Sequence, residues 1–124
     1  MATGSIKVEN DSGWMDCTMQ SGFDHWASNY KLQYRKIGRI CYIRGIAKNT
    51  EIMSANDTHN IATVPAGFRP NIDVYGMFQG SGMNRFSGWV ASSGVIKMAR
   101  YGTTTAIDVA TGSFLPMFFC YPIG

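Results

Sequence analysis

Charged residues are scarce in this sequence. They make up 15% of its 124 residues, whereas an ordinary globular domain has roughly 25%. The formal net charge is only +3, and the lysines and arginines are scattered along the chain. This pattern argues against a protein that binds nucleic acid through a basic surface. It also indicates that another copy of the chain covers part of the surface, because a small domain would otherwise expose much uncharged area.

Cysteine is rare as well. The chain has 3 cysteines, Cys17, Cys41 and Cys120, and no pair of them has the C-x-x-C spacing of a metal site. All three lie in apolar stretches. We therefore expect buried free thiols, with no disulfide framework and no bound metal.

Groups for catalysis are few. The chain has 2 histidines and 8 acidic residues, and no segment places two carboxylates together as a glycosidase requires. Asp24-His25 and Asp57-x-His59 each put an acid near an imidazole, but both lie in expected loops. Adjacent residues of an extended chain also point to opposite sides, which spoils a relay geometry. We expect no enzyme and no cofactor.

Long apolar runs are missing too. No run reaches the roughly 20 residues of a membrane-spanning helix, and no signal peptide is recognisable, so we expect no membrane insertion. The length fits one domain. Residues 1–13 have the character of a tag remnant followed by a polar linker, which places the domain at residues 14–124.

Glycine and aromatic residues, by contrast, are abundant. Glycine occurs 14 times and aromatics form 13% of the chain, a combination that favours pleated strands over helices. About eight short strands without a helical period predict an all-β fold, either an antiparallel sandwich or a Greek-key or jelly-roll-like barrel. The expected strands lie within residues 14–19, 32–37, 39–46, 61–64, 72–78, 84–90, 94–101, 104–109 and 115–121.

The clearest of these signals is a hairpin in residues 31–46. Two stretches of strand character flank Gly38, which supplies the turn. Residues 21–29 and 48–60 instead carry small polar side chains without a sustained period, and we expect surface loops there.

A rigid corner is expected at residues 65–70. A proline stands at each end of the segment and a glycine near its centre, which is typical of a structural turn. We expect Gly67 to have a positive φ, Phe68 to pack inward, and Arg69 to bond nearby carbonyl groups or an acid.

Aromatic side chains with polar neighbours suit saccharide binding better than catalysis, because aromatic faces pack on sugar C–H groups while charged groups bond hydroxyls. Trp26 lies in the expected loop 21–29 without a periodic partner, so we expect a sugar or another subunit to cover it. The other aromatics, Tyr75 and Trp89 among them, are expected to pack in the core. The predicted ligand site consists of Asp24, His25, Trp26, Arg44, Asp73 and Arg85.

Three pieces of the sequence follow one another in a distinctive order. Gly13-Trp14 opens the first strand, Leu32–Gly45 (LQYRKIGRICYIRG) forms the hairpin, and Ala62–Pro70 (ATVPAGFRP) forms the corner. Over residues 14–121 this order resembles the C-terminal head domain of phage tail and baseplate receptor-binding proteins. The sequence departs from that family's pattern at Val64, where leucine is usual.

The resemblance implies a homotrimer in the virion, at the tail tip or baseplate of a phage or prophage particle. Its implied partners are other tail or baseplate proteins and a host cell-surface saccharide, bound without covalent chemistry. Three weak sites on one head would gain effective concentration. Two other classes stay open: a structural baseplate or capsid decoration domain, and a small wall-polysaccharide hydrolase, against which the missing carboxylate pair argues.

Overall fold

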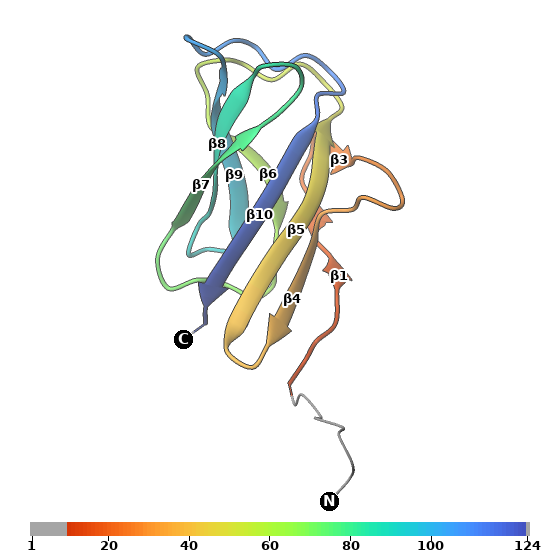
Figure 1. Cartoon of the computed structure of the whole chain (residues 1–124), viewed down its shortest axis with the longest axis vertical. Coiled ribbons are helices and arrows are strands. Elements are labelled where there is room, and N and C mark those ends of the chain that lie inside the picture. The colour runs from red at the N-terminus through yellow and green to blue at the C-terminus, as the bar shows by residue number, and fades with distance from the viewer. Residues whose placement is uncertain (1–9, 124) are drawn as a thin grey trace, which may run out of the picture.

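The structure is a computed structural model that describes residues 10–123. Within these residues, ten strands form two five-stranded antiparallel sheets that pack as a sandwich (Figure 1). Sheet A has the order β1-β4-β5-β10 with β3 paired to β5, and sheet B has the order β2-β6-β9-β8-β7. The all-β prediction is confirmed. The strands are β1 Met15–Asp16, β2 Thr18–Met19, β3 Phe23–His25, β4 Gln33–Ile37, β5 Ile40–Asn49, β6 His59–Thr63, β7 Val74–Gln79, β8 Arg85–Val90, β9 Val95–Gly102 and β10 Leu115–Pro122.

The chain enters the sandwich by passing from one sheet to the other. β1 pairs with β4 in sheet A, and β2 pairs with β6 in sheet B. Between them the N–H of Cys17 donates to the carbonyl oxygen of Leu32 at 2.9 Å, and the Cys17 side chain is buried. Asp16 and Thr18 are exposed. The strand predicted within residues 14–19 therefore forms, but as two short strands instead of one.

Sheet A is built on the predicted hairpin. β4 and β5 pair from Gln33↔Arg44 to Ile37↔Ile40. The turn between them contains Gly38 at φ 60°, a conformation that glycine adopts without steric cost. β10 pairs with the other side of β5 from Ile40 to Ala47, which makes β5 the central strand of the sheet.

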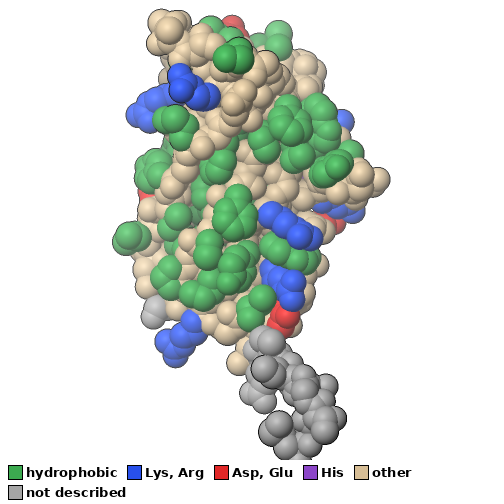
Figure 2. Space-filling model, viewed as in Figure 1, with side chains coloured by type: hydrophobic (Ala, Val, Ile, Leu, Met, Phe, Trp, Pro, Cys, Tyr) green, Lys and Arg blue, Asp and Glu red, His purple; other side chains and the backbone are tan. Residues whose placement is uncertain are grey.

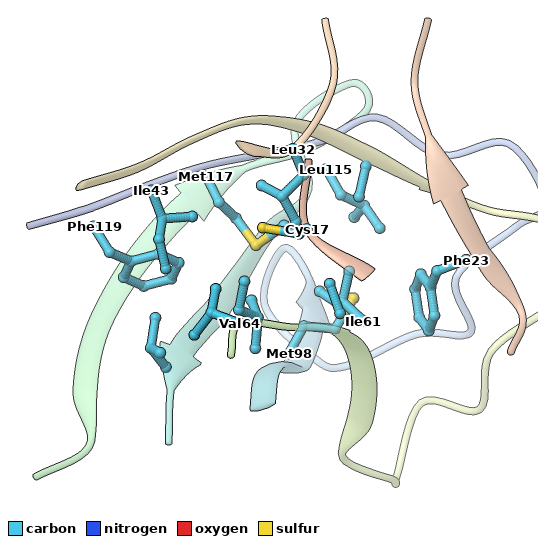
Figure 3. Close-up of a cluster of buried hydrophobic side chains, with 14 of the residues drawn as sticks. Cys17, Phe23, Leu32, Ile43, Ile61, Val64, Met98, Leu115, Met117 and Phe119 are labelled. Atoms are coloured by element: carbon cyan, nitrogen blue, oxygen red, sulfur yellow. The ribbon is translucent and has the colours of Figure 1, made fainter. Parts of the chain in front are cut away.

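The core lies between the two sheets (Figure 3). Leu32 and Ile43 on the side of sheet A and Ile61 and Met98 on the side of sheet B are all fully buried and belong to one cluster. β10 supplies a row to this cluster, since every second side chain from its first residue is buried. Burial of one such large apolar side chain contributes roughly 1.5–3 kcal/mol to stability.

The corner at residues 65–70 forms as predicted. Gly67 has φ 91°. The half-buried ring of Phe68 packs edge-on against Tyr34, with 4.7 Å between the ring centroids. The Nε of Arg69 donates to the carbonyl oxygen just before the corner at 3.4 Å. These contacts fix the corner against sheet A and against the end of β6.

Two loop predictions are wrong. The segment 21–29 contains the strand β3, which pairs with the last residues of β5. The segment 48–60 begins as a strand, because Lys48 and Asn49 continue β5. Both errors have one cause: β3 and the end of β5 pair with each other, and pairing between distant segments overrides their polar composition.

The strand predicted at residues 104–109 is wrong as well, since the structure has only isolated bridges in that segment. The buried side chain of Asn49 takes the hydrogen bonds that a neighbouring strand would otherwise make. Its Nδ2 donates to the carbonyl oxygens of Val109 and Ala110 at 2.9 Å each, and its Oδ1 accepts from the N–H of Ser113 at 2.9 Å. One amide thus fixes the irregular segment before β10.

The cysteines are free, as expected, and Cys17 and Cys41 are buried. Burial raises the pKa of the Cys17 thiol to about 12, so the reactive thiolate is not formed at neutral pH. The expectation for Cys120 is wrong, because this residue is exposed. It occupies an outward position of β10, in the middle of an apolar stretch whose alternate residues face solvent.

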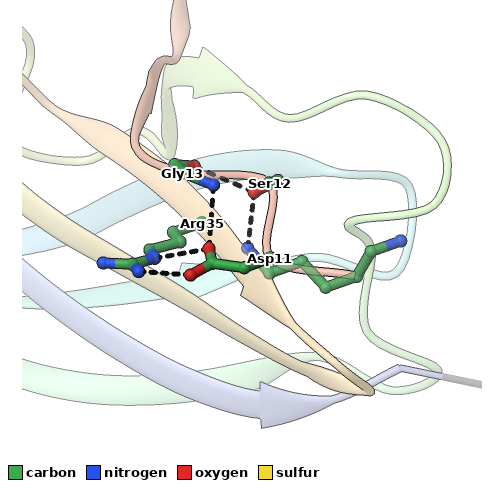
Figure 4. Close-up of polar contacts among 5 residues, drawn as sticks. Asp11, Ser12, Gly13 and Arg35 are labelled. Atoms are coloured by element: carbon green, nitrogen blue, oxygen red, sulfur yellow. Dashed lines mark hydrogen bonds and ion pairs between the residues drawn. The ribbon is translucent and has the colours of Figure 1, made fainter. Parts of the chain in front are cut away.

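Residues 10–13 are attached to the β4–β5 hairpin (Figure 4). The carboxylate of Asp11 accepts two hydrogen bonds from the guanidinium of Arg35, at 2.8 and 2.5 Å, and one from the N–H of Gly13 at 2.9 Å. The N–H of Ser12 donates to the carbonyl oxygen of Lys36. Residues 1–9 of the predicted tag and linker lie outside the described residues, and the domain boundary at residue 14 stays a prediction.

Candidate functional site

The first part of the predicted site lies along β3. Asp24 is exposed, and its Oδ1 accepts the N–H of His25 at 2.7 Å. The Nδ1 of His25 accepts the N–H of Leu32 at 3.0 Å, so this imidazole holds the chain before β4. One ring nitrogen of His59 is likewise 2.7 Å from the carbonyl oxygen of Ser54. Both histidines of the chain therefore make local backbone contacts.

Trp26 follows β3 and is half-buried. Its backbone N–H donates to the carbonyl oxygen of Ile46 at 3.0 Å. Its indole contacts the ring of Phe114 edge-on, with 5.1 Å between the ring centroids. Part of the cover that we expected from a sugar or another subunit thus comes from Phe114 of the same chain. Phe114 lies far along the chain, so no local pattern could have revealed this contact.

Arg44 lies on the outer face of sheet A. Its guanidinium carbon is 3.8 Å from the ring centroid of Trp14, a cation–π contact. It lines a hollow of about 330 Å³ beside Lys31 and Gln33. Both of these side chains hydrogen-bond the carboxylate of Asp16, and these two bonds lower the pKa of that carboxyl group. Arg44 and its neighbours are thus already partnered within the sheet.

The last two predicted residues lie at opposite ends of the β7–β8 hairpin. The Oδ1 of Asp73 accepts the N–H of Ser92 at 2.9 Å, just beyond the pair Val74↔Val90. Arg85 is at the other end of β8, about 20 Å away at the rise of an extended strand. The structure therefore distributes the six predicted residues over β3, the outer face of sheet A and both ends of sheet B.

A different candidate site, which sequence reasoning missed, lies on the outer face of sheet B. Tyr75 and Trp89 are cross-strand neighbours, and their rings stack with 5.1 Å between centroids and 21° between planes. Tyr75 is 62% exposed, so the expectation that it packs in the core is wrong. The two rings line a hollow of about 350 Å³ with Ala55, Asn56, Asp57, Thr58, Ala99 and Arg100.

The loop that forms one wall of this aromatic hollow is held in place by hydrogen bonds between side chains and backbone groups. The N–H of Ala55 donates to the Oδ1 of Asp108 at 2.9 Å, and the contact of His59 with Ser54 closes the same loop. A volume of about 350 Å³ is at the lower end of the range for small-ligand sites. The hollow therefore offers a stacked aromatic surface beside an amide, a carboxylate, a hydroxyl and a guanidinium.

A second hollow of about 290 Å³ adjoins the first and shares Arg100 with it. Arg85, Met77, Ser87 and Thr103 are among its lining residues. One of the six predicted residues, Arg85, therefore does lie at this face. The alternation of β7, in which Val74 and Phe78 point the other way from Tyr75, is the sequence signal that could have found it.

Across residues 10–123, no three His, Cys, Asp or Glu side chains are grouped as metal ligands. That same part of the chain has no helix that could cross a membrane.

Solved structures share this fold. The chain is similar to the receptor-binding head domain of lactococcal phage bIL170, with a TM-score of 0.61 and 20% identity over 90% of this chain and 97% of that one. It is also similar to the receptor-binding protein of Listeria phage PSA, with a TM-score of 0.59 and 18% identity over 87% of this chain and 64% of that one. No family model and no curated protein matches the sequence. The chain thus has the fold of phage receptor-binding head domains, as its sequence motifs indicate.

Proposed function

We propose that this chain is the head domain of a phage or prophage receptor-binding protein, and that it attaches the particle to a host by binding a cell-surface saccharide without catalysis. The observation that carries the proposal is the match of nearly the whole chain to the head domain of a phage receptor-binding protein. Such a domain acts at the tail tip or baseplate, joined to other tail proteins.

The aromatic hollow supports a saccharide as the ligand. Sugars bind proteins through C–H groups that pack on aromatic faces and through hydroxyls that bond polar side chains. Tyr75 and Trp89 supply the faces, and Asn56, Asp57 and Thr58 stand at the rim. The hollow thus has the groups that the predicted site requires, in a different place.

The outer face of sheet A supports the homotrimer. Figure 2 shows hydrophobic side chains gathered over β5 and β10. Phe118 is 57% exposed there, and the strand register puts it beside Arg44, in a row next to Tyr42 and Cys120. Large apolar patches on soluble proteins mark interaction sites. Association of three copies through this face would combine three weak saccharide sites into firm attachment.

Cell binding tests the function. Fluorescently labelled protein is added to a panel of Gram-positive cells, before and after periodate oxidation of surface saccharides or protease digestion of surface proteins. We expect binding to at least one strain that periodate abolishes and protease leaves intact. Binding that only protease abolishes would contradict the saccharide, absence of binding would favour a decoration domain, and release of reducing sugar from purified walls would indicate a hydrolase.

Two tryptophan variants separate the predicted site from the aromatic hollow. If the hollow is the site, Trp89→Ala abolishes cell binding and Trp26→Ala retains it. If the loop after β3 is the site, the two results are exchanged. The melting temperature and the oligomeric state of each variant are measured in parallel, because a variant that dissociates or unfolds would lose binding indirectly.

A further inference from the structure

A β-bulge interrupts the edge of the aromatic hollow. β8 and β9 pair regularly up to Ser87↔Ala99, but the next pair is Arg85↔Gly102. β9 therefore contains one residue more than β8 across this step. Arg100 lies within it and has φ 58°, a left-handed conformation that is unfavourable for any residue with a Cβ.

The bulge decides where the Arg100 side chain lies. Ile96 and Met98 are buried, so strict alternation would direct the next even position between the sheets as well. Instead Ala99 and Arg100 both line the outer hollow, while Tyr101 is buried. The irregularity thus brings a guanidinium to the outer face of sheet B, in the way that bulges elsewhere re-aim a side chain beside a site.

The cations on this face have no acidic partner among residues 10–123. Arg85 and Arg100 line one hollow, and Lys97 pairs in register with Trp89. The two salt bridges found among the described residues are Lys31–Asp16 and Arg35–Asp11, both at sheet A. Asp57 lines the aromatic hollow but lies beyond 4.0 Å from any of the three cations.

From this arrangement, and resting on the proposed function, we infer that the saccharide carries an anionic group. The sugar ring packs against the exposed side of the Tyr75–Trp89 stack, and one of its hydroxyls donates a hydrogen bond to the carboxylate of Asp57. Its phosphate or carboxylate lies in the adjoining hollow between Arg85 and Arg100. A guanidinium suits this role because its planar array of N–H donors matches both anions. The carboxylate of Asp57 on the opposite wall disfavours the reverse orientation by like-charge repulsion.

The test compares Arg100→Asn with Arg39→Asn. Both remove one exposed arginine, but Arg39 lies in the turn between β4 and β5, away from the hollow. Asparagine tolerates the left-handed conformation better than arginine does, so we expect Arg100→Asn to keep or raise the melting temperature. If it lowers the melting temperature, Arg85→Gln removes the second guanidinium without touching the bulge.

The probes are N-acetylglucosamine 6-phosphate, glucuronic acid, N-acetylglucosamine and inorganic phosphate, titrated while the tryptophan indole resonances are followed by NMR. We expect at least one of the two charged sugars to bind at least tenfold more tightly than the neutral sugar. The charged sugar that binds shows whether the site prefers a phosphate or a carboxylate. Binding should weaken with salt and at least fivefold in Arg100→Asn, but not in Arg39→Asn. Equal binding of charged and neutral sugars, or binding of inorganic phosphate as tight as that of the sugar phosphate, would overturn the inference.

Cell binding separates this inference from the function on which it rests. If wild-type protein binds cells through a periodate-sensitive receptor and Arg100→Asn binds equally well, the anion site is wrong and the adhesion function stands. If wild-type protein binds no cell but the charged sugar still requires Arg100, the anion site stands and the adhesion function is wrong.

Discussion

The outer faces of the two sheets use their charged residues differently. On sheet A, Arg35 is paired with Asp11 and Arg44 lies on the ring of Trp14. On sheet B, Arg85 and Arg100 line a hollow without any carboxylate partner among residues 10–123.

This difference is the basis of our proposal for what each face binds. A face that carries paired charges such as Arg35–Asp11 and exposed apolar side chains such as Phe118 is suited to a copy of the same chain. A face with aromatic rings beside free guanidinium groups is suited to a ligand that brings an anion. We therefore propose that the sandwich separates self-association from ligand binding, with each on the outer face of a different sheet.

The most severe way to break sheet A is Gly45→Ala. Gly45 has φ 127°, and a Cβ built there would lie 2.0 Å from the carbonyl oxygen of Lys31. Since that atom is backbone, the start of β4 would have to move away from β5. We expect a loss of more than about 3 kcal/mol in the free energy of unfolding, or no folded protein, measured by chemical denaturation.

Gly38→Ala is the control for that change. Gly38 also has a positive φ, 60°, but nothing lies within 4 Å of its added Cβ. The control should cost only the left-handed conformation, about 1–2 kcal/mol. Equal effects of the two variants would show that backbone strain, and not the close approach of β4 and β5, makes glycine necessary at residue 45.

Self-association tests the assignment of sheet A. Phe118→Glu places a charge in the centre of its outer face, and we expect at least a tenfold loss in the association constant, because burial of one such side chain is worth roughly 1.5–3 kcal/mol. Sedimentation velocity gives the oligomeric state. Met77→Glu makes the matched change on sheet B, where Met77 is 69% exposed, and should leave the oligomer intact. A wild-type chain that is monomeric at micromolar concentration would contradict the homotrimer.

Ligand binding tests the assignment of sheet B. Tyr75→Ala removes half of the stacked aromatic surface, and we expect the charged sugar that binds wild-type protein to bind about three- to tenfold more weakly, the range for one aromatic contact. Tyr30→Ala is the control, because Tyr30 is a similarly exposed aromatic, at 53%, beside the hollow on sheet A. Weaker binding in Tyr30→Ala alone would move the ligand to the face that we assign to self-association.

The sequence allowed the prediction of those parts of the fold whose causes are local. The β4–β5 hairpin follows from alternation about Gly38, and the corner follows from its prolines and Gly67. β3 and the role of Asn49 were missed because each depends on backbone groups that are distant in sequence. In these cases a tertiary partner decides what the local composition leaves undetermined.

The candidate site was harder to predict than the fold. Of the predicted residues none lines the aromatic hollow, and only Arg85 lines the adjoining one. Tyr75 and Trp89 come together through strand register, which turn geometry and pairing decide. Arg100 lies outward only because of the bulge, and alternation alone would have placed it in the core.

The smallest expected effect is on the melting temperature at acidic pH. The hydrogen bond from Arg35 lowers the pKa of Asp11 from 3.8 to about 2. Because the pKa is lower in the folded state, the pair stabilises the fold fully above pH 3.8, and this contribution is lost as the pH falls through about 2. The melting temperature of Asp11→Asn should therefore lie slightly below that of the wild type at pH 7, and the two should converge towards pH 2.

Arg100→Asn should show no such pH-dependent difference, since no carboxylate among the described residues pairs with Arg100. A difference that grows as the pH falls would show that Asp11 does not act through its charge, and a pH-dependent difference for Arg100→Asn would remove the distinction between the two faces.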